Sequence, residues 1–251
     1  MTILYFSATG NSLAVAKKIG GELLSIPKLM KENRYEITDD VIGVITPTYC
    51  ADLPKMVREY LSKAKLTAEY TFIICTYGYI AGAVTSHMRE YMEKAAGHID
   101  YDAKIIMVDT ALTLFETQKQ IDTLPKKDVE GQIKKVQEDI AARKKNTTKV
   151  SAFHKGLDWF YHAAGGYHIA ADRDKDFTIT DACIKCGICA KVCPADNIKV
   201  TDHVEYLHHC EGCLACLNAC PKNEIHLKNE KSSVRFRNED VTLQEIIDGN
   251  N

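Results

Sequence analysis

Two copies of one cysteine pattern constrain this chain more than any other feature of its sequence. The first copy, CIKCGICAKVCP, occupies residues 183–194, and the second, CEGCLACLNACP, occupies residues 210–221. An offset of 27 residues superimposes all four cysteines, the proline that follows them and an isoleucine further on. The last third of the chain therefore contains a duplication, and its fold must bring eight of the ten cysteines into two equivalent arrangements.

The spacing of these cysteines favours iron–sulfur clusters over other uses of thiols. Three cysteines separated by two residues can surround one cluster, and a fourth cysteine followed by proline is carried to a second cluster in the bacterial two-cluster pattern. A pair of zinc sites is one alternative, but such sites usually take two separated cysteine pairs or cysteines with histidines. A disulfide framework is the other alternative, and a reducing cytoplasm disfavours it.

The crossed pattern assigns the eight cysteines to two 4Fe-4S clusters. Short alternating segments flank the runs, at 176–180 with 197–200 and at 203–207 with 224–227, and they suit two small hairpins that cover the clusters. One cluster is expected to take Cys183, Cys186, Cys189 and Cys220, and the other Cys210, Cys213, Cys216 and Cys193.

Composition narrows the class of protein. The chain has 251 residues, which suits two domains, and its formal net charge of −2 gives no electrostatic signature for nucleic acid. No run of 18 apolar residues is present and the first residues do not resemble a signal peptide, so we expect no membrane span and a cytoplasmic location.

The first 150 residues alternate between strand-like and helical patterns. Strands are expected near residue 3 and from residues 41, 71 and 104, with a weak second strand near Tyr35–Ile37. The helical patterns include residues 13–23, and an apolar stripe in 128–145 made of Val129, Ile133, Val136 and Ile140. This alternation predicts a parallel sheet covered by helices on both faces.

A polar loop follows the first strand directly and precedes a helix. Its sequence is SATGNS, residues 7–12, and it lacks the lysine of a nucleoside triphosphate loop and the glycines of a dinucleotide loop. Such residues also cap helices for structural reasons alone. The alternative is a phosphate site at the helix N-terminus, made by Ser7, Thr9, Gly10, Asn11 and Ser12.

Two further loops end strands of the same sheet. They read TPTYCADLP at residues 46–54 and CTYGYIAGA at residues 75–83. In an open parallel sheet, ligands bind outside the carboxyl ends of strands at the point where the strand order reverses, as FMN does in the 2-1-3-4-5 order. Glycines allow close backbone approach there, and Tyr49, Tyr77 and Tyr79 offer flat faces to a flavin ring, although each could be an ordinary surface residue. Cys75 is expected to be a buried small side chain, whereas Cys50 could contact a flavin or fill space.

Together these motifs resemble the flavodoxin-ferredoxin fusion proteins of anaerobic microbes. The resemblance implies a flavodoxin-like doubly wound α/β sheet of order 2-1-3-4-5 that binds FMN, followed by a smaller α+β bacterial ferredoxin-like domain with two 4Fe-4S clusters. It departs from many flavodoxins in the loop of residues 49–52, which has neither a tryptophan nor a glycine. The ring contacts that it implies are Pro47, Thr48, Tyr49, Cys50, Ala51, Asp52, Thr76, Tyr77 and Gly78.

The expected domains are a flavodoxin-like domain at 1–150, an aromatic-rich linker helix at 151–175 that docks one domain on the other, a ferredoxin domain at 176–230 and a polar tail at 231–251 that ends in a short helix.

A flavin exchanges one or two electrons and each cluster exchanges one. We therefore expect an electron-transfer protein that passes electrons between FMN, the clusters and a redox protein partner. The alternative is a flavin-dependent reductase of a small molecule, such as a quinone, that the clusters supply. No hydrolytic constellation of side chains stands out.

Overall fold

The computed structural model describes residues 1–148 and 171–251 of the chain. The expected linker helix at 151–175 lies outside these residues, apart from its last five positions, which form a turn and the start of a short 3-10 helix. Within the described ranges no helix is long and apolar enough to cross a membrane.

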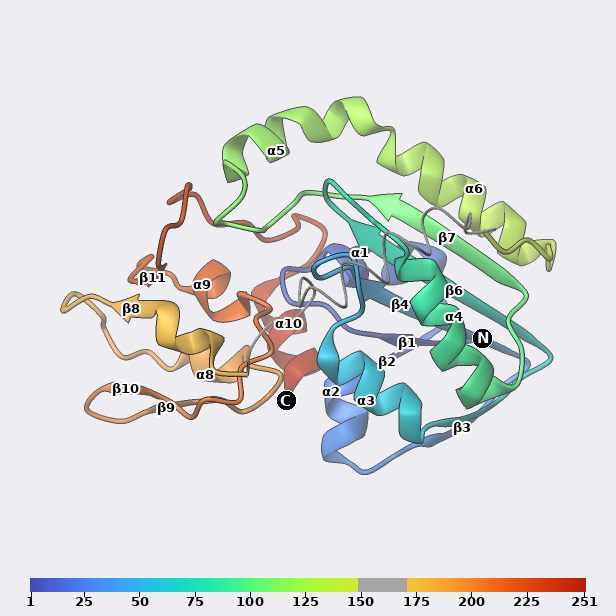
Figure 1. Ribbon diagram of the computed structural model, residues 1–251, viewed down its shortest axis with the longest axis horizontal. Helices are drawn as coiled ribbons and strands as arrows, with labels where there is room; N and C mark the ends of the chain where they lie inside the picture. Colours follow the sequence, from blue (N-terminus) through green and yellow to red (C-terminus); the bar gives the residue numbers. More distant parts are fainter. Residues whose placement is uncertain (149–170) are drawn as a thin grey trace.

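A five-stranded parallel sheet forms the centre of the N-terminal domain (Figure 1). Its order is β2-β1-β4-β6-β7, which is the 2-1-3-4-5 order of the doubly wound flavodoxin-like fold. The expected fold class is confirmed. The strands are β1 (Thr2–Tyr5), β2 (Glu22–Ser25), β4 (Val41–Pro47), β6 (Tyr70–Tyr77) and β7 (Tyr101–Ile106).

The second strand lies elsewhere than the sequence indicated. The helix after the phosphate loop ends at Ile19, because Gly20 and Gly21 adopt φ values of 88° and 103°, and the chain then forms β2 at the sheet edge. The segment near Tyr35 instead contributes β3 (Glu36–Thr38), which pairs in parallel with β5 (Lys65–Thr67) in a separate two-stranded sheet.

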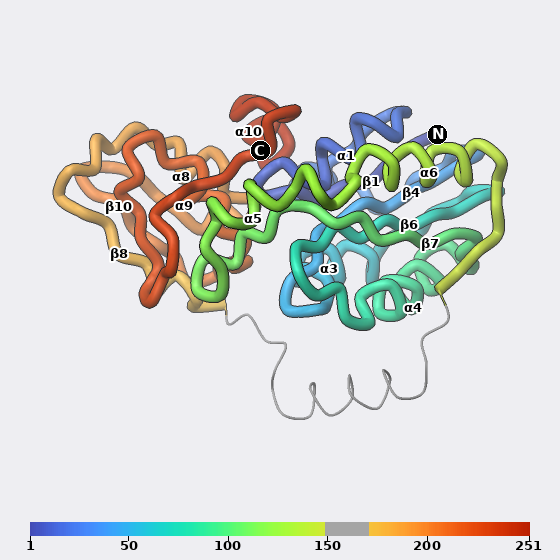
Figure 2. The backbone as a smooth tube through the Cα atoms, turned by 90° about the horizontal axis from the view of Figure 1, so that it is seen from above, coloured from blue at the N-terminus to red at the C-terminus, as the bar shows by residue number. Residues whose placement is uncertain are grey.

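Helices cover both faces of the central sheet (Figure 2). One face packs against α1 (Asn11–Ile19) and α6 (Val129–Ala141), whose predicted stripe is buried at Ile133, Val136 and Ile140. The other face packs against α2 (Ile26–Lys31), α3 (Lys55–Lys63) and α4 (Val84–Ala96). After β7 the chain continues through α5 (Thr117–Thr123) and the 3-10 helix η1 (Leu124–Lys127).

The ferredoxin-like domain is built from two related halves. Its elements are η2 (Arg173–Asp176), β8 (Phe177–Ile179), α8 (Ile188–Lys191), β9 (Ile198–Val200), β10 (Val204–Tyr206), α9 (Ala215–Ala219) and β11 (Ile225–Leu227). The strands pair as β8 with β11 and β9 with β10, both antiparallel. The expected pairing of each cysteine run's own flanking segments is therefore wrong. The outer pair joins the two ends of the domain, and the inner pair is a hairpin that connects the two runs.

The C-terminal tail is an ordered part of the fold. It ends in α10 (Leu243–Asn250), and Thr242 and Glu245 form a reciprocal capping box at the start of this helix. The expected short helix is confirmed. Its buried Ile246 belongs to the core beneath α1, so the tail returns from the ferredoxin-like domain to the N-terminal sheet (Figure 1).

Candidate functional site

The eight repeated cysteines line two separate hollows of four cysteines each. We call the hollow that contains Cys186 the outer cup and the hollow that contains Cys213 the inner cup. The empty volume is about 350 Å³ in the outer cup and about 310 Å³ in the inner cup, counting space open to solvent. Each cup takes three cysteines from one run and the fourth from the other run. The outer cup is lined by Cys183, Cys186, Cys189 and Cys220, and the inner cup by Cys193, Cys210, Cys213 and Cys216.

The backbone turns in the same way around both cups. Positive φ values recur at positions 27 residues apart, so the two runs share one backbone conformation at these positions. The Asn197 N–H donates to Cys193 Sγ at 3.3 Å, and the Glu224 N–H donates to Cys220 Sγ at the same distance. Amide donors of this kind stabilise cluster thiolates and tune their potential. The repeated positive-φ positions are Lys185 with Gly212, Gly187 with Leu214, and Asp196 with Asn223.

Burial in the cups disfavours free thiolates. It raises the pKa of Cys189 in the outer cup and of Cys210 in the inner cup to about 11. It also raises the pKa values of Cys213 and Cys216 well above the usual value, and the neighbouring thiols add to that effect. Metal ligation requires the thiolate form, so these buried cysteines would serve as ligands only where a cationic metal compensates their charge.

The SATGNS loop lies between β1 and α1, at the carboxyl edge of the sheet. Gly10 is the N-cap of α1 with φ of 92°, and glycine has no side chain that could cap the first-turn N–H groups of this helix. The buried Ser7 Oγ has no hydrogen-bond partner among residues 1–148 and 171–251, so its hydroxyl is suited to a polar ligand. These features fit a phosphate group.

Two members of the predicted phosphate set use their side chains differently from what we expected. The Asn11 Nδ2 donates to the Val108 carbonyl oxygen at 3.0 Å, and Asn11 Oδ1 accepts from Asn238 Nδ2 at 3.2 Å. The Ser12 hydroxyl lies 2.8 Å from the hydroxyl of Thr76 and is fully buried. Both side chains therefore brace the loop, and their backbone N–H groups remain at the helix N-terminus.

The loop after β4 forms a tight turn. Tyr49 and Asp52 exchange backbone hydrogen bonds of 2.8 and 2.9 Å, and the central residues Cys50 and Ala51 adopt φ of 50° and 62°. Two successive positive φ values are typical of a type I′ turn, which usually contains glycine or asparagine, so Cys50-Ala51 is strained. Strain of this kind concentrates at functional sites.

Asp52 anchors that turn through a buried ion network. Its carboxylate pairs with Arg58, lies 2.9 Å from His87 Nδ1 and accepts from the Leu53 N–H at 2.7 Å. Burial alone would raise the pKa of Asp52, but the hydrogen bonds from His87 and Leu53 and the charge of Arg58 outweigh it and hold the pKa below its usual value. Asp52 is therefore a structural anion and is not available as a free acid.

The loop after β6 approaches the two neighbouring loops closely. A Cβ on Gly78 would lie 2.2 Å from Asp109 Cβ, so only glycine fits beside the loop that follows β7. Thr48 N–H donates to the Thr76 carbonyl oxygen at 2.8 Å, while the buried Thr48 Oγ1 has no partner in the part of the chain that the structure describes. This second orphaned hydroxyl lies in the predicted ring loop and fits a polar ligand edge. The predicted ring residues Pro47, Tyr77 and Ala51 lie at the same edge, Cys75 is fully buried as expected, and Cys50 is exposed.

The inner cup lies against these loops of the N-terminal domain. Cys213 packs against the hydrophobic core under α3 and α4, which Tyr49 also contacts. Glu211 Oε2 accepts from the Met56 N–H at 3.1 Å, so a side chain between two cup cysteines reaches the first turn of α3. Burial, together with the charges of Cys213 and Glu211, raises the pKa of Tyr49 well above its usual value. The outer cup faces away, with Cys186 exposed and Ile184 57% exposed beside it.

Some residues of this region were missed by sequence reasoning. Val108 and Asp109 belong to a fourth loop at the carboxyl edge of the sheet, and their position at the end of the predicted strand run KIIMVDT, residues 104–110, could have identified them. Glu211 stands inside the second cysteine run, yet only its partner Met56 in the other domain reveals its role. Nothing in the sequence of the polar tail pointed to a functional role for Asn238.

Comparison with known proteins characterises the ferredoxin-like domain. Residues 175–221 match the family profile of the 4Fe-4S dicluster domain. The pyruvate synthase subunit PorD of Methanothermobacter marburgensis is 35% identical over 57 residues, which are 23% of this chain and 69% of that subunit. PorD of Methanocaldococcus jannaschii is 37% identical over 49 residues, which are 18% of this chain and 56% of that subunit.

Solved structures resemble the N-terminal part only loosely. Two-electron reduced flavodoxin of Megasphaera elsdenii covers 44% of this chain and 89% of its own, with 19% identity and a TM-score of 0.33. Rubredoxin oxygen:oxidoreductase of Desulfovibrio gigas covers 57% of this chain and 36% of its own, with 13% identity and a TM-score of 0.30. At these scores the strand order remains the basis for describing the fold.

Proposed function

Because the chain belongs to the two-cluster 4Fe-4S ferredoxin family and joins that domain to a flavodoxin-like domain, we propose that it is an electron-transfer protein. In this proposal it passes electrons between FMN and two 4Fe-4S clusters and on to a redox protein partner. When bound, FMN supplies exchange of one or two electrons and each cluster exchange of one.

The position of the inner cup carries this proposal. Its cysteines lie on the face of the ferredoxin-like domain that packs against the loops at the carboxyl edge of the sheet, through Cys213 and Glu211. The outer cup opens to solvent at Cys186. The cluster of Cys193, Cys210, Cys213 and Cys216 would therefore be the one near the flavin, and the cluster of Cys183, Cys186, Cys189 and Cys220 would exchange electrons with the partner.

The N-terminal loops would hold FMN, with the Asn11 and Ser12 side chains bracing the phosphate loop. The hydroxyl of Ser7 and the first-turn N–H groups of α1 would hold the phosphate, with Gly10 permitting the turn. The turn of residues 49–52 and the segment 76–78 would border the ring, and the buried Thr48 hydroxyl, which has no partner among the described residues, would be available to a polar group of the ligand. Asp52, fixed by Arg58 and His87, would keep that border in one conformation.

Anaerobic purification with a count of metal, sulfide and flavin tests the proposal. We expect about eight iron atoms and eight sulfides per chain, with one FMN. Cys50→Ser is a matched control that should leave the iron count unchanged, because Cys50 lines neither cup. Stoichiometric zinc in place of iron would contradict the cluster half of the proposal. Absence of FMN after gentle isolation would contradict the flavin half.

The same preparation distinguishes a carrier from a reductase. A carrier should exchange electrons with other redox proteins and show no sustained turnover of small molecules. Steady anaerobic consumption of a quinone by the reduced protein, at a rate that depends on bound FMN, would instead identify a flavin-dependent reductase.

A further inference from the structure

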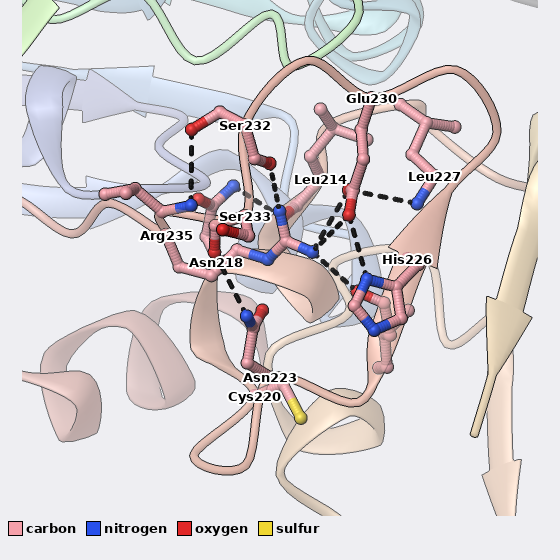
Figure 3. A network of polar contacts seen from close by, with 12 residues as sticks. Leu214, Asn218, Cys220, Asn223, His226, Leu227, Glu230, Ser232, Ser233 and Arg235 are labelled. Atoms are coloured by element: carbon pink, nitrogen blue, oxygen red, sulfur yellow. Dashed lines mark hydrogen bonds and ion pairs between the residues drawn. The ribbon is translucent and has the colours of Figure 1, made fainter. Parts of the chain in front are cut away.

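The C-terminal tail crosses from one domain to the other and contacts the phosphate loop. We call residues 236–251 the C-terminal strap. Arg235, immediately before it, is fixed in the ferredoxin-like domain, where its guanidinium pairs with Glu230 at 3.0 Å and donates to the Ile225 carbonyl oxygen at 2.9 Å (Figure 3). His226 Nδ1 lies 2.8 Å from the same Glu230 carboxylate. The strap therefore begins next to a residue that side-chain contacts hold within the ferredoxin-like domain.

The strap then makes direct contacts with the SATGNS loop. The Asn238 N–H donates to the Thr9 carbonyl oxygen at 2.9 Å, and its Nδ2 donates to Asn11 Oδ1 at 3.2 Å. A Cβ placed on Gly10 would lie 3.1 Å from the Cβ atoms of both Asn238 and Val241. Asn238 and Val241 are buried, at 7% and 1% exposure. These contacts cover one side of the turn that begins α1.

The rest of the strap connects helices α1 and α2 to the backbone beside the inner cup. Lys17 of α1 donates to the Asp240 carbonyl oxygen at 2.7 Å, which ties the strap to the helix that follows the phosphate loop. At the end of α10, the Lys31 ammonium donates to the Asn250 carbonyl oxygen at 2.8 Å. Asn250 Nδ2 donates to the Val192 carbonyl oxygen at 2.8 Å, one residue before Cys193 of the inner cup.

We propose that the strap completes the phosphate site from the ferredoxin-like domain and that Asn238 is its positioning residue. The Asn11 side chain is held between Val108 on one side and Asn238 on the other, so its orientation depends on the strap. Asn11 is the first residue of α1, and its N–H belongs to the group that would receive the phosphate. Retention of FMN would then depend on the presence and placement of the ferredoxin-like domain. This inference rests on the proposed FMN site.

Affinities for FMN and for riboflavin, measured on the full-length protein, test this inference. Riboflavin lacks the phosphate, so it reports on the ring loops alone. Asn238→Ala should raise the dissociation constant for FMN about three- to tenfold, the range expected for a lost hydrogen bond, and leave that for riboflavin unchanged. Gln244→Ala, on the exposed side of α10 where the side chain donates to Asp248, is the matched control and should change neither.

A second variant keeps the test decisive if the alanine variant is poorly folded. Asn238→Asp preserves the shape and the backbone bond to Thr9, but a carboxylate cannot donate to Asn11 Oδ1 and adds negative charge near the phosphate. Asn238→Asp should weaken FMN binding more than Asn238→Ala does. Unchanged FMN affinity in both variants, or equal losses for FMN and riboflavin, would overturn the role of the strap. Failure of the wild-type protein to bind FMN would instead remove the site on which the inference rests.

Discussion

The ion network around Asp52 allows a quantitative test of how the ring loop is held. Asp52→Asn keeps the shape of the side chain and an oxygen that can accept from the Leu53 N–H, but it removes the charge that pairs with Arg58 and contacts His87. The side chain of Asp52 is 6% exposed, that of His87 is 15% and that of Arg58 is 28%. The network is therefore buried on the anionic side and partly hydrated on the cationic side.

The expected loss lies between the values for buried and exposed ion pairs. Breaking a fully buried pair costs about 3–5 kcal/mol, whereas an exposed pair contributes about 0–1 kcal/mol. Because Arg58 can partly rehydrate, we expect Asp52→Asn to destabilise the protein by about 2–3 kcal/mol, which lowers the melting temperature by about 4–12 °C for a chain of this size. Asp122→Asn, an exposed control on α5, should change stability by less than about 0.5 kcal/mol.

Thermal unfolding at several pH values is the assay. The pKa of Asp52 is depressed in the folded state, so the network stabilises the protein above the unfolded pKa of about 3.9 and is lost as pH falls through the lower folded value. The difference between wild type and Asp52→Asn should therefore be largest near neutrality and shrink below about pH 4. A difference no larger than that of Asp122→Asn at neutral pH would refute the reasoning.

Three further substitutions probe the loops and the domain contact. Gly78→Ala places a Cβ 2.2 Å from Asp109 Cβ, so it should cost about 1–3 kcal/mol and weaken FMN binding; unchanged flavin affinity would show that the loops can separate freely. Glu211→Ala leaves the buried Met56 N–H unpaired and should cost about 1–3 kcal/mol in denaturant unfolding, and an unaffected midpoint would deny this contact a role. Ala51→Gly relieves a φ of 62° and should stabilise the protein by about 1 kcal/mol; destabilisation would mean that the turn is not strained.

Much of the architecture could be predicted because its signals are local. Apolar periodicity identified the main strands and α6, and a cysteine spacing that repeats at an offset of 27 residues predicted the ferredoxin-like domain. The second strand was misplaced because β2 is only four residues long and half-exposed, so its composition differs little from that of a helix end. The strand pairing of the ferredoxin-like domain was wrong for another reason, since antiparallel pairing across a duplication depends on long-range closure that spacing does not encode.

The candidate site was predictable where one loop carries the chemistry. The SATGNS loop and the turn of residues 49–52 lie at the expected edge of the sheet because the carboxyl ends of parallel strands meet there. What the sequence did not disclose were contacts between distant segments. The Asn11 side chain forms hydrogen bonds with Val108 and Asn238, which are more than 90 and more than 220 residues away in the sequence. No local pattern indicates such partners.

The iron content of paired cysteine variants tests the two crossed cups most directly. Cys193→Ser combined with Cys213→Ser removes two ligands of one proposed cluster and should leave about four iron atoms per chain. Cys193→Ser combined with Cys186→Ser removes one ligand from each cluster and should leave almost none. If instead the second pair retained about four iron atoms and the first pair lost nearly all, each cysteine run would hold its own cluster, and the crossed arrangement would be wrong.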